Sequence, residues 1–274
     1  MNKYVLVYTF IFLFTISCKK DDNPNPPGGG ASTTLSSYPL KLGNEWKYHT
    51  TVSFTSDSFN AFINDFSTYR FDSLTSFGGY DSIYSLVTKD SSDDGSIYNS
   101  SVYYIQDNSG LYKVGYIYGS GPRVFLKTDR KVQFKLGNKV FDSLRDVYNI
   151  LINSSTDSLI IENPPLLTLK YPAVQNETWT YRNYDEPFYI GKKYIGLQTV
   201  STNAGVFQCY KVIFLYDINK DSIIDPDITT TQFISPSKGL VKTDFQSIIE
   251  IMDMGVVVDT GYFSQQSILT SVNF

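Results

Sequence analysis

The feature that most constrains the fold is an alternation of apolar and polar residues, clearest between residues 45 and 54. One side of this run carries Trp46, Tyr48, Thr50, Val52 and Phe54, and the other carries Glu45, Lys47, His49, Thr51 and Ser53. Successive side chains of a strand point to opposite faces, so the run predicts a sheet with one buried and one solvated face. Strand-like runs recur at residues 83–89, 101–106, 111–118, 123–128, 131–136, 178–184, 189–200, 206–216, 228–234, 240–246 and 267–274. We therefore expect a mainly β fold.

One stretch follows a different period and predicts a single helix near residues 138–152. Its apolar residues recur at spacings of three and four, as Leu136, Val140, Leu144, Val147 and Leu151. This spacing places them on one side of a helix. Asn138 or Asp142 could cap its start. Two further strands are the alternative interpretation.

The chain repeats two short phrases in the same order. Residues 43–48 read Gly-Asn-Glu-Trp-Lys-Tyr and residues 176–181 read Asn-Glu-Thr-Trp-Thr-Tyr, and they contain the two Trp residues of the chain. A Gly-Leu-x-Lys phrase follows in each part, beginning at Gly110 and at Gly239. The repeat predicts a pseudo-duplicated β domain at 38–274, with halves at about 38–168 and 169–274, and each Trp packed inside its half. Whether the halves form one domain or two stays open.

Residues 1–37 have the pattern of an export signal followed by a tether. Lys3 precedes an apolar run from Tyr4 to Ile16, which is shorter than the roughly 20 residues that span a bilayer. Residues 1–17 are therefore interpreted as a signal peptide. Residues 18–37 begin with Cys18 and are rich in Pro and Gly, which predicts a disordered spacer.

The end of this signal resembles the bacterial lipobox. Thr15-Ile16-Ser17-Cys18 matches it in the small residue and the Cys, and departs from it at Thr15. The resemblance implies that Cys18 is acylated with fatty acids and anchors the chain to a membrane. The Lys-Lys-Asp-Asp run at 19–22 resembles export signals that send lipoproteins to the outer face of the outer membrane. An ordinary secreted protein cut elsewhere is the alternative.

Three phrases resemble a loose group of Gram-negative outer-membrane lipoproteins of unknown function. They are Gly-Asn-x-Trp-x-Tyr at 43–48, Ala-Gly-Val-Phe-Gln-Cys-Tyr-Lys-Val at 204–212 and Gly-Leu-Val-Lys at 239–242. The resemblance covers about residues 38–245. It implies a curved antiparallel sheet or half-barrel that wraps around a helix or an apolar ligand, and it brings no catalytic residues.

Charge and cysteine content exclude several classes of protein. The formal net charge is −4, and loss of Lys3 with the signal makes it about −5, which argues against a nucleic-acid partner. If Cys18 is acylated, Cys209 has no partner for an intrachain disulfide. Its place in an apolar strand predicts an inert core thiol. No oligomeric state is predicted.

The best candidate for a metal site is the acidic loop at 217–227. Asp217, Asn219 and Asp221 alternate as in the first half of a calcium loop, and Asp225 falls at its ninth position. Ser222 stands where such loops have Gly, and Ile228 stands where they have an acid. An acidic hairpin loop is the alternative to a Ca²⁺ site.

Residues for catalysis are scarce. His49 is the only His and lies on the polar side of its strand, and no Gly-rich phosphate loop or Gly-x-Ser-x-Gly elbow occurs. We therefore expect a non-enzymatic, lipid-anchored surface protein with a binding or scaffolding role. Carriage of an apolar ligand is one alternative. A glycan-binding surface protein is another, in which sugars stack on Tyr103, Tyr104, Tyr112, Tyr116 and Tyr118. A hydrolase that acts on surface glycans through loop carboxylates is the last.

Overall fold

The computed structural model describes residues 34–58, 60–93, 95, 97–118, 132–137, 139–142, 156–183 and 189–274, which belong to one unit, Ser32–Phe274. These residues form fourteen strands and no helix. The strands are β1 (Glu45–Thr55), β2 (Asn60–Phe77), β3 (Tyr80–Ser92), β4 (Ile97–Gln106), β5 (Gly110–Tyr118), β6 (Gln133–Leu136), β7 (Lys139–Phe141), β8 (Thr156–Lys170), β9 (Thr178–Asn183), β10 (Tyr189–Thr202), β11 (Gly205–Asp217), β12 (Ile228–Ser235), β13 (Gly239–Asp253) and β14 (Val256–Asn273). A helix long and apolar enough to cross a membrane is accordingly not found among them.

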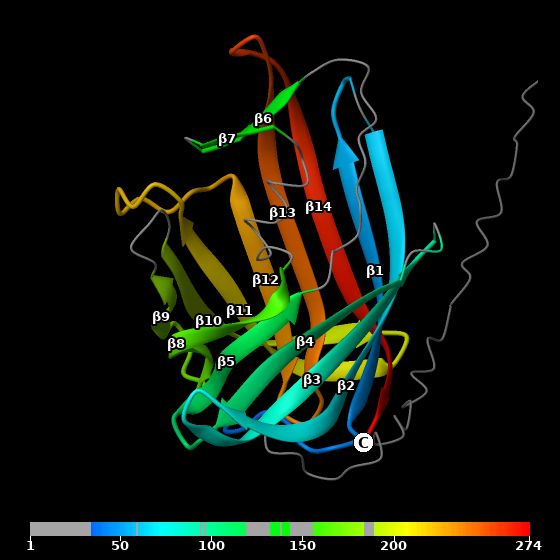
Figure 1. Ribbon diagram of the computed structural model, residues 1–274, viewed down its shortest axis with the longest axis vertical. Helices are drawn as coiled ribbons and strands as arrows, with labels where there is room; N and C mark the ends of the chain where they lie inside the picture. Colours follow the sequence, from blue (N-terminus) through cyan, green and yellow to red (C-terminus); the bar gives the residue numbers. More distant parts are fainter. Residues whose placement is uncertain are drawn as a thin grey trace, which may run out of the picture. The chain divides into compact units, whose positions relative to one another are not determined.

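Twelve of these strands form one antiparallel path in the order β8-β5-β4-β3-β2-β1-β14-β13-β12-β11-β10-β9 (Figure 1). The path consists of two meanders of six strands, β1 to β5 with β8, and β9 to β14. They join where β1 pairs with β14, from Glu45 opposite Asn273 to Thr55 opposite Tyr262. The short strands β6 and β7 lie off this path, and β6 pairs with β13. Both predicted halves therefore contribute to one curved antiparallel sheet.

The two end strands of the path, β8 and β9, meet along a line that we call the seam. Side chains from the second half bond to backbone carbonyls of β8 there. Trp179 Nε1 donates to the Leu167 carbonyl at 3.0 Å, and the Tyr194 hydroxyl donates to the Lys170 carbonyl at 2.8 Å. The sheet is therefore nearly closed and barrel-like, more so than the predicted half-barrel.

The turns before β1 and β9 have the same pattern of hydrogen bonds. Gly43 and Asn176 take corresponding places and both have a positive φ, of 87° and 66°. Gly43 N–H donates to the Phe71 carbonyl of β2, and Asn176 N–H donates to the Tyr194 carbonyl of β10. In return, Phe71 N–H donates to the Asn44 carbonyl, and Tyr194 N–H donates to the Glu177 carbonyl. Asn tolerates the left-handed region that Gly occupies in the first copy.

The two Trp residues pack inside, as predicted. Trp46 lies against Phe71 with ring centroids 5.5 Å apart, and Trp179 lies against Tyr194 at 4.7 Å. Phe71 and Tyr194 are the same residues that bond to the two turns. Each repeat therefore fixes one indole against an aromatic ring of its neighbouring strand.

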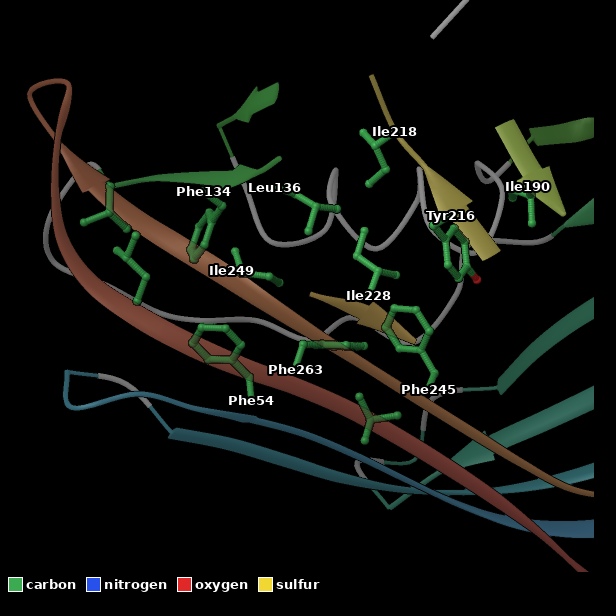
Figure 2. Packing of buried hydrophobic residues seen from close by; sticks show 13 residues of the cluster. Phe54, Phe134, Leu136, Ile190, Tyr216, Ile218, Ile228, Phe245, Ile249 and Phe263 are labelled. Atoms are coloured by element: carbon green, nitrogen blue, oxygen red, sulfur yellow. The ribbon is translucent and has the colours of Figure 1, made fainter. Parts of the chain in front are cut away.

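The inner face of the sheet is filled by three clusters of apolar side chains. Figure 2 shows one of them, in which Phe54 of β1, Phe245 of β13 and Phe263 of β14 lie near Phe134 and Leu136 of β6. The strand β6 is not part of the path, and Phe134 and Leu136 pack into the interior against the side chains of β1, β13 and β14. Burial of each such side chain stabilises the fold by about 1.5 to 3 kcal/mol.

The helix prediction is wrong at its first turn. Lys139–Phe141 is β7, a strand that pairs with β6, in agreement with the alternative of two further strands. Leu136 faces the core from β6, while Val140 is exposed, so these two residues do not share one face. Residues 143–152 lie outside the described residues, as do residues 123–128.

Two long strands were not predicted. In β2 the inward positions include Asp65 and Ser67, which interrupt the apolar alternation. In β8 the pair Pro164-Pro165 lies in a wide bulge, because Ile161 faces Gly115 while Leu166 faces Lys113. Proline is tolerated there because β8 is an end strand and the bulge needs no ladder bonds.

The predicted tether ends earlier than expected. Leu35 is fully buried and its carbonyl accepts a hydrogen bond from Ala173 N–H at 3.0 Å, so packed structure begins before Tyr38. The predicted signal peptide at 1–17, Cys18 and the first part of the tether lie outside the described residues.

Candidate functional site

A small cavity lies among the described residues of the interior. A cavity of about 70 Å³ lies among Tyr38, Leu86, Tyr104, Leu111, Thr168, Leu169, Gln232, Ile234 and Leu240. Sites for small-molecule ligands usually enclose about 300 to 1,000 Å³. This cavity is too small for the acyl chains that an apolar carrier must enclose.

Four charged side chains are buried at the seam: Lys113 of β5, Glu162 of β8, Arg182 of β9 and Lys192 of β10. Glu162 Oε1 lies 2.7 Å from Arg182 Nη2 and 3.7 Å from Lys113 Nζ. The bulge in β8 lies opposite β5, where Lys113 pairs with Leu166. Glu162 belongs to this bulge and therefore lies close to Lys113. With exposed fractions of 6% or less, these side chains offer no surface to a dissolved substrate. The seam cluster therefore holds the two ends of the sheet together.

Lys192 belongs to the same cluster. Its ammonium nitrogen donates to the Thr168 carbonyl at 3.0 Å and lies over the rings of Tyr181 and Phe214, at 4.2 and 4.3 Å from their centroids. Burial lowers the pKa of Lys192 well below its usual value, and the charges of Lys113 and Arg182 lower it further. Carbonyl and ring faces thus replace water around this amine.

The acidic loop lies between β11 and β12, and its carboxylates bond to the backbone. The two oxygens of Asp217 accept hydrogen bonds from Asp221 N–H at 3.1 Å and Ser222 N–H at 2.9 Å. Asp225 Oδ2 accepts one from Ile218 N–H at 2.7 Å, and Asn219 Nδ2 donates to Asp221 Oδ2 at 2.9 Å. Within the described ranges, three or more acidic, His or Cys side chains nowhere gather as metal ligands would. The loop has the contacts of an acidic hairpin, and Ca²⁺ binding stays a prediction.

The calcium prediction has a direct test. If the loop binds Ca²⁺, addition of the ion raises the melting temperature, because a ligand that binds only the folded state stabilises it. Asp221→Ala should abolish the rise, whereas Asp81→Ala on β3 should not. Differential scanning fluorimetry with CaCl₂ against EDTA measures both. Equal melting temperatures for the wild type in the two buffers would show that the loop is only a hairpin.

Of the tyrosines predicted to stack on sugars, the four described side chains are buried or half-buried. Tyr116 is buried, Tyr104 packs against two of the core clusters, and Tyr103 lies edge-on to Phe77 with centroids 5.1 Å apart. Tyr112 donates or accepts a hydrogen bond at 2.5 Å with Ser109. The side chain of Tyr118 lies outside the described residues. The stacking prediction is wrong for Tyr116, which is buried, and it stays a prediction for the half-buried Tyr103, Tyr104 and Tyr112.

Exposed aromatic rings occur on the outer face of β2 and β14, on either side of β1. Phe62, Phe66 and Tyr262 are 62%, 57% and 61% exposed. Phe62 pairs with Ser53 and Phe66 pairs with His49 on β1, while Tyr262 pairs with Thr55 from the other side. The three rings therefore share one solvated face, which we call the aromatic face. Contiguous apolar patches on a folded domain mark sites of interaction, whereas single exposed apolar side chains are common on any surface.

Polar side chains surround these rings. His49 stacks on Phe66 with centroids 5.0 Å apart, and its Nε2 lies 3.1 Å from Asn64 Oδ1. The Ser53 and Ser264 hydroxyls bond across β1 and β14 at 2.8 Å. Asn64 also donates its side-chain N–H to Asp93 Oδ2 at 3.3 Å. These bonds hold the polar groups in place around Phe62 and Phe66 and pre-organise the surface for binding.

A shallow groove of about 290 Å³ adjoins Phe66. It is lined by Lys47, Tyr48, Phe66, Ser67, Thr68, Lys89, Ser91 and Thr270. A β-bulge produces it, because Lys47 pairs with Ser271 and Tyr48 with Leu269, which leaves Thr270 extra. The Thr270 hydroxyl donates to the Lys47 carbonyl at 2.9 Å. Bulges bend a strand and redirect its side chains, and here the result is a hollow beside an exposed ring.

The sequence contained part of the signal for this face. His49 was correctly placed on the polar side of its strand. Phe62 and Phe66 were missed because β2 was not predicted, although Asn60, Phe62, Asn64, Phe66, Thr68 and Arg70 alternate with Ala61, Ile63, Asp65, Ser67, Tyr69 and Phe71. The two buried polar residues made the inner set look solvated.

Comparison with known proteins gives structural likenesses only. No family model matches the chain, and no curated protein matches it. Three solved structures share part of the architecture: a candidate lipoprotein from Parabacteroides distasonis, a candidate exported protein with a YmcC-like fold from Bacteroides fragilis, and a β-barrel-like protein of a domain of unknown function from Brucella abortus. Their identities to this chain are 15%, 14% and 8%, with TM-scores of 0.37, 0.39 and 0.37. The matches cover 86% of this chain and 97%, 98% and 99% of those chains. Likenesses at this level carry no argument about ligand or activity.

Proposed function

We propose that this chain is a non-enzymatic lipoprotein, anchored through Cys18 in the outer membrane at the cell surface, that binds carbohydrate on its aromatic face. The observation that carries the proposal is the exposure of Phe62, Phe66 and Tyr262 on one solvated sheet face. The location rests on the N-terminal sequence, and the binding role rests on the geometry of the face.

Carbohydrate is the ligand class that fits both kinds of group on this face. The C–H faces of a sugar ring stack on aromatic rings, and its hydroxyls bond to Ser, Thr, Asn and His side chains. The aromatic face offers an aromatic ring and polar side chains within one strand spacing, since Phe66 is flanked by His49 on β1 and Ser91 on β3. Phe62 and Phe66 are separated by four residues of an extended strand, about 13 Å, which suits an elongated ligand.

The same face supports binding without hydrolysis. A glycosidase needs two carboxylates placed on either side of the scissile bond. Near Phe66 the carboxylate of Asp93 accepts hydrogen bonds from Asn64, and that of Glu45 lies 3.7 Å from Lys47 Nζ. Both are engaged by neighbours, and we assign no catalytic step to them.

Removal of one exposed ring is expected to weaken glycan binding. Phe66→Ala should lower the affinity at least fivefold, about 1 kcal/mol, because the stacking surface at the centre of the face is lost. Isothermal titration against the best ligand from a glycan array, with residues 31–274, measures the change.

Val206→Ala is the matched control, since Val206 is 69% exposed on β11, away from the aromatic face. It should bind as the wild type does. Equal affinity of Phe66→Ala and wild type would place the glycan elsewhere, and a wild type that binds no glycan on the array would refute the proposal.

The anchor is tested separately. Wild-type cells labelled with a fatty-acid analogue should yield a tagged protein, and Cys18→Ser should lose the tag. Cys209→Ser is the control, since Cys209 is fully buried and should not affect labelling. Persistent labelling of Cys18→Ser would contradict the anchor, and resistance of the wild type to protease on intact cells would contradict surface exposure.

A further inference from the structure

Two lysines flank the groove beside Phe66. Lys47 of β1 pairs with Thr68 of β2, and Thr68 pairs with Lys89 of β3. All three lie on the outer face and line the groove. The two lysines are therefore two strand spacings apart, about 10 Å, with a threonine between them.

The charges around this row are mostly positive. Arg70 lies two residues beyond Thr68 on β2 and pairs with Glu45, which lies 3.7 Å from Lys47. The other neighbours of the two lysines across the sheet are uncharged: Ser271 and Thr270 on β14 and Asn99 on β4. The row thus has three cations and one carboxylate on a protein with a net charge of −4. A local excess of positive charge on an acidic protein selects anionic ligands.

The lysines and the ring lie at a fixed separation. Phe66 and Thr68 are two residues apart on β2, about 7 Å, so each lysine lies one diagonal step from the ring. Lysine provides a flexible point charge, which suits a carboxylate whose position varies along a polymer. A sugar stacked on Phe66 therefore places an acidic group of its own ring, or of the next ring, within reach of Lys47 or Lys89.

We infer that the glycan bound at the aromatic face is anionic, a uronate-containing polysaccharide whose carboxylates are bound by Lys47 and Lys89. This inference rests on the proposed carbohydrate binding and adds the chemical class of the sugar. Phe66 supplies the stacking surface and the two lysines supply the charge selectivity. Removal of the charges should abolish selectivity and leave stacking in place.

The experiment compares polymers that differ only in charge. Polygalacturonate and hyaluronan are each titrated beside their methyl esters, which keep the backbone and neutralise the carboxylates. Wild type should bind the acid forms about tenfold more tightly than the esters at low salt, and the preference should shrink at high ionic strength, where exposed charges are screened. Lys47→Gln/Lys89→Gln should bind acid and ester alike, with the ester affinity of the wild type. Lys220→Gln, an exposed lysine in the loop between β11 and β12, is the control and should keep the preference.

The outcomes separate this inference from the proposed function. Equal binding of acids and esters by the wild type would overturn the anionic specificity and leave carbohydrate binding standing. Binding of neither form would overturn both. Anionic lipid vesicles offer charge without a sugar face, and wild type that binds them as tightly as polygalacturonate would show that the lysines recognise charge alone.

Discussion

Glu162→Gln is expected to lower the free energy of unfolding by about 3 to 5 kcal/mol, because it removes one partner of a buried ion pair and leaves the other charged. Glu162 is the carboxylate that faces Arg182 at 2.7 Å and Lys113 at 3.7 Å. A neutral amide accepts a hydrogen bond from Arg182 but does not offset two buried positive charges. Urea denaturation followed by Trp fluorescence measures the change, since Trp179 donates to the seam strand β8.

Glu250→Gln is the matched control for this prediction. Glu250 bonds to Lys135 at 2.6 Å, but the two side chains are 41% and 32% exposed. Exposed ion pairs contribute about 1 kcal/mol or less, so the same substitution should be mild here. If the two variants lose similar amounts of unfolding free energy, burial is not what makes the Glu162–Arg182 pair stabilising.

A double variant tests whether the seam needs charge at all. Glu162→Leu/Arg182→Met replaces the closest pair by apolar side chains and should recover part of the stability lost in Glu162→Gln, because buried ion pairs are often replaceable by packed apolar groups. Lys113 remains charged in this variant, so recovery should be incomplete. A double variant less stable than Glu162→Gln would mean that the ion pair itself, rather than compensation of charge, closes the sheet.

The sequence predicted the fold well where burial follows the two-residue period. β1 alternates cleanly, and both its inward Trp46 and its outward His49 lie as expected. The repeated turns were also visible, since Gly43 and Asn176 belong to phrases with a common spacing. Local chemistry dictates both features, so they need no knowledge of the partners across the sheet.

The remaining features depend on pairing between distant strands. In the sequence, nothing distinguishes Glu162 and Arg182 from ordinary surface charges. In the structure, the bulge in β8 and the approach of β9 bury the two side chains together. Phe66 and Tyr104 are both aromatic residues of strands, and only the register shows that the first faces water and the second the core. Candidate site residues were therefore the hardest to predict, because the face of a strand, not the residue type, decides their role.

Asp90 is another charged residue on the inner face, and its substitution is expected to raise the free energy of unfolding. It lies on β3 opposite Ser67 of β2, and the neighbouring pair is Ser92 opposite Asp65. The Ser92 hydroxyl donates to Asp65, and Asp90 Oδ1 is buried and accepts no hydrogen bond from the described residues. Burial raises the pKa of Asp90 to about 6, the Ser67 hydroxyl lowers it, and the charge of Asp65 raises it. Two carboxyl groups thus share one poorly solvated part of the inner face.

The effect on stability follows from proton binding. Between about pH 4 and pH 6 the folded state keeps a proton on Asp90 that the unfolded state has lost, so this group makes stability fall as pH rises through that range. Above pH 6 the charged carboxylate stays buried and its cost is constant.

Asp90→Asn removes that charge and should raise the free energy of unfolding at pH 7 by about 1 to 3 kcal/mol, with a smaller gain at pH 4. Asp81→Asn, at an exposed position of the same strand, should change stability by less than about 0.5 kcal/mol at either pH. Urea denaturation of wild type and both variants at pH 4, 5, 6 and 7 gives the comparison, and an Asp90→Asn protein less stable than wild type at pH 7 would mean that the carboxylate is bonded and charged in the folded state.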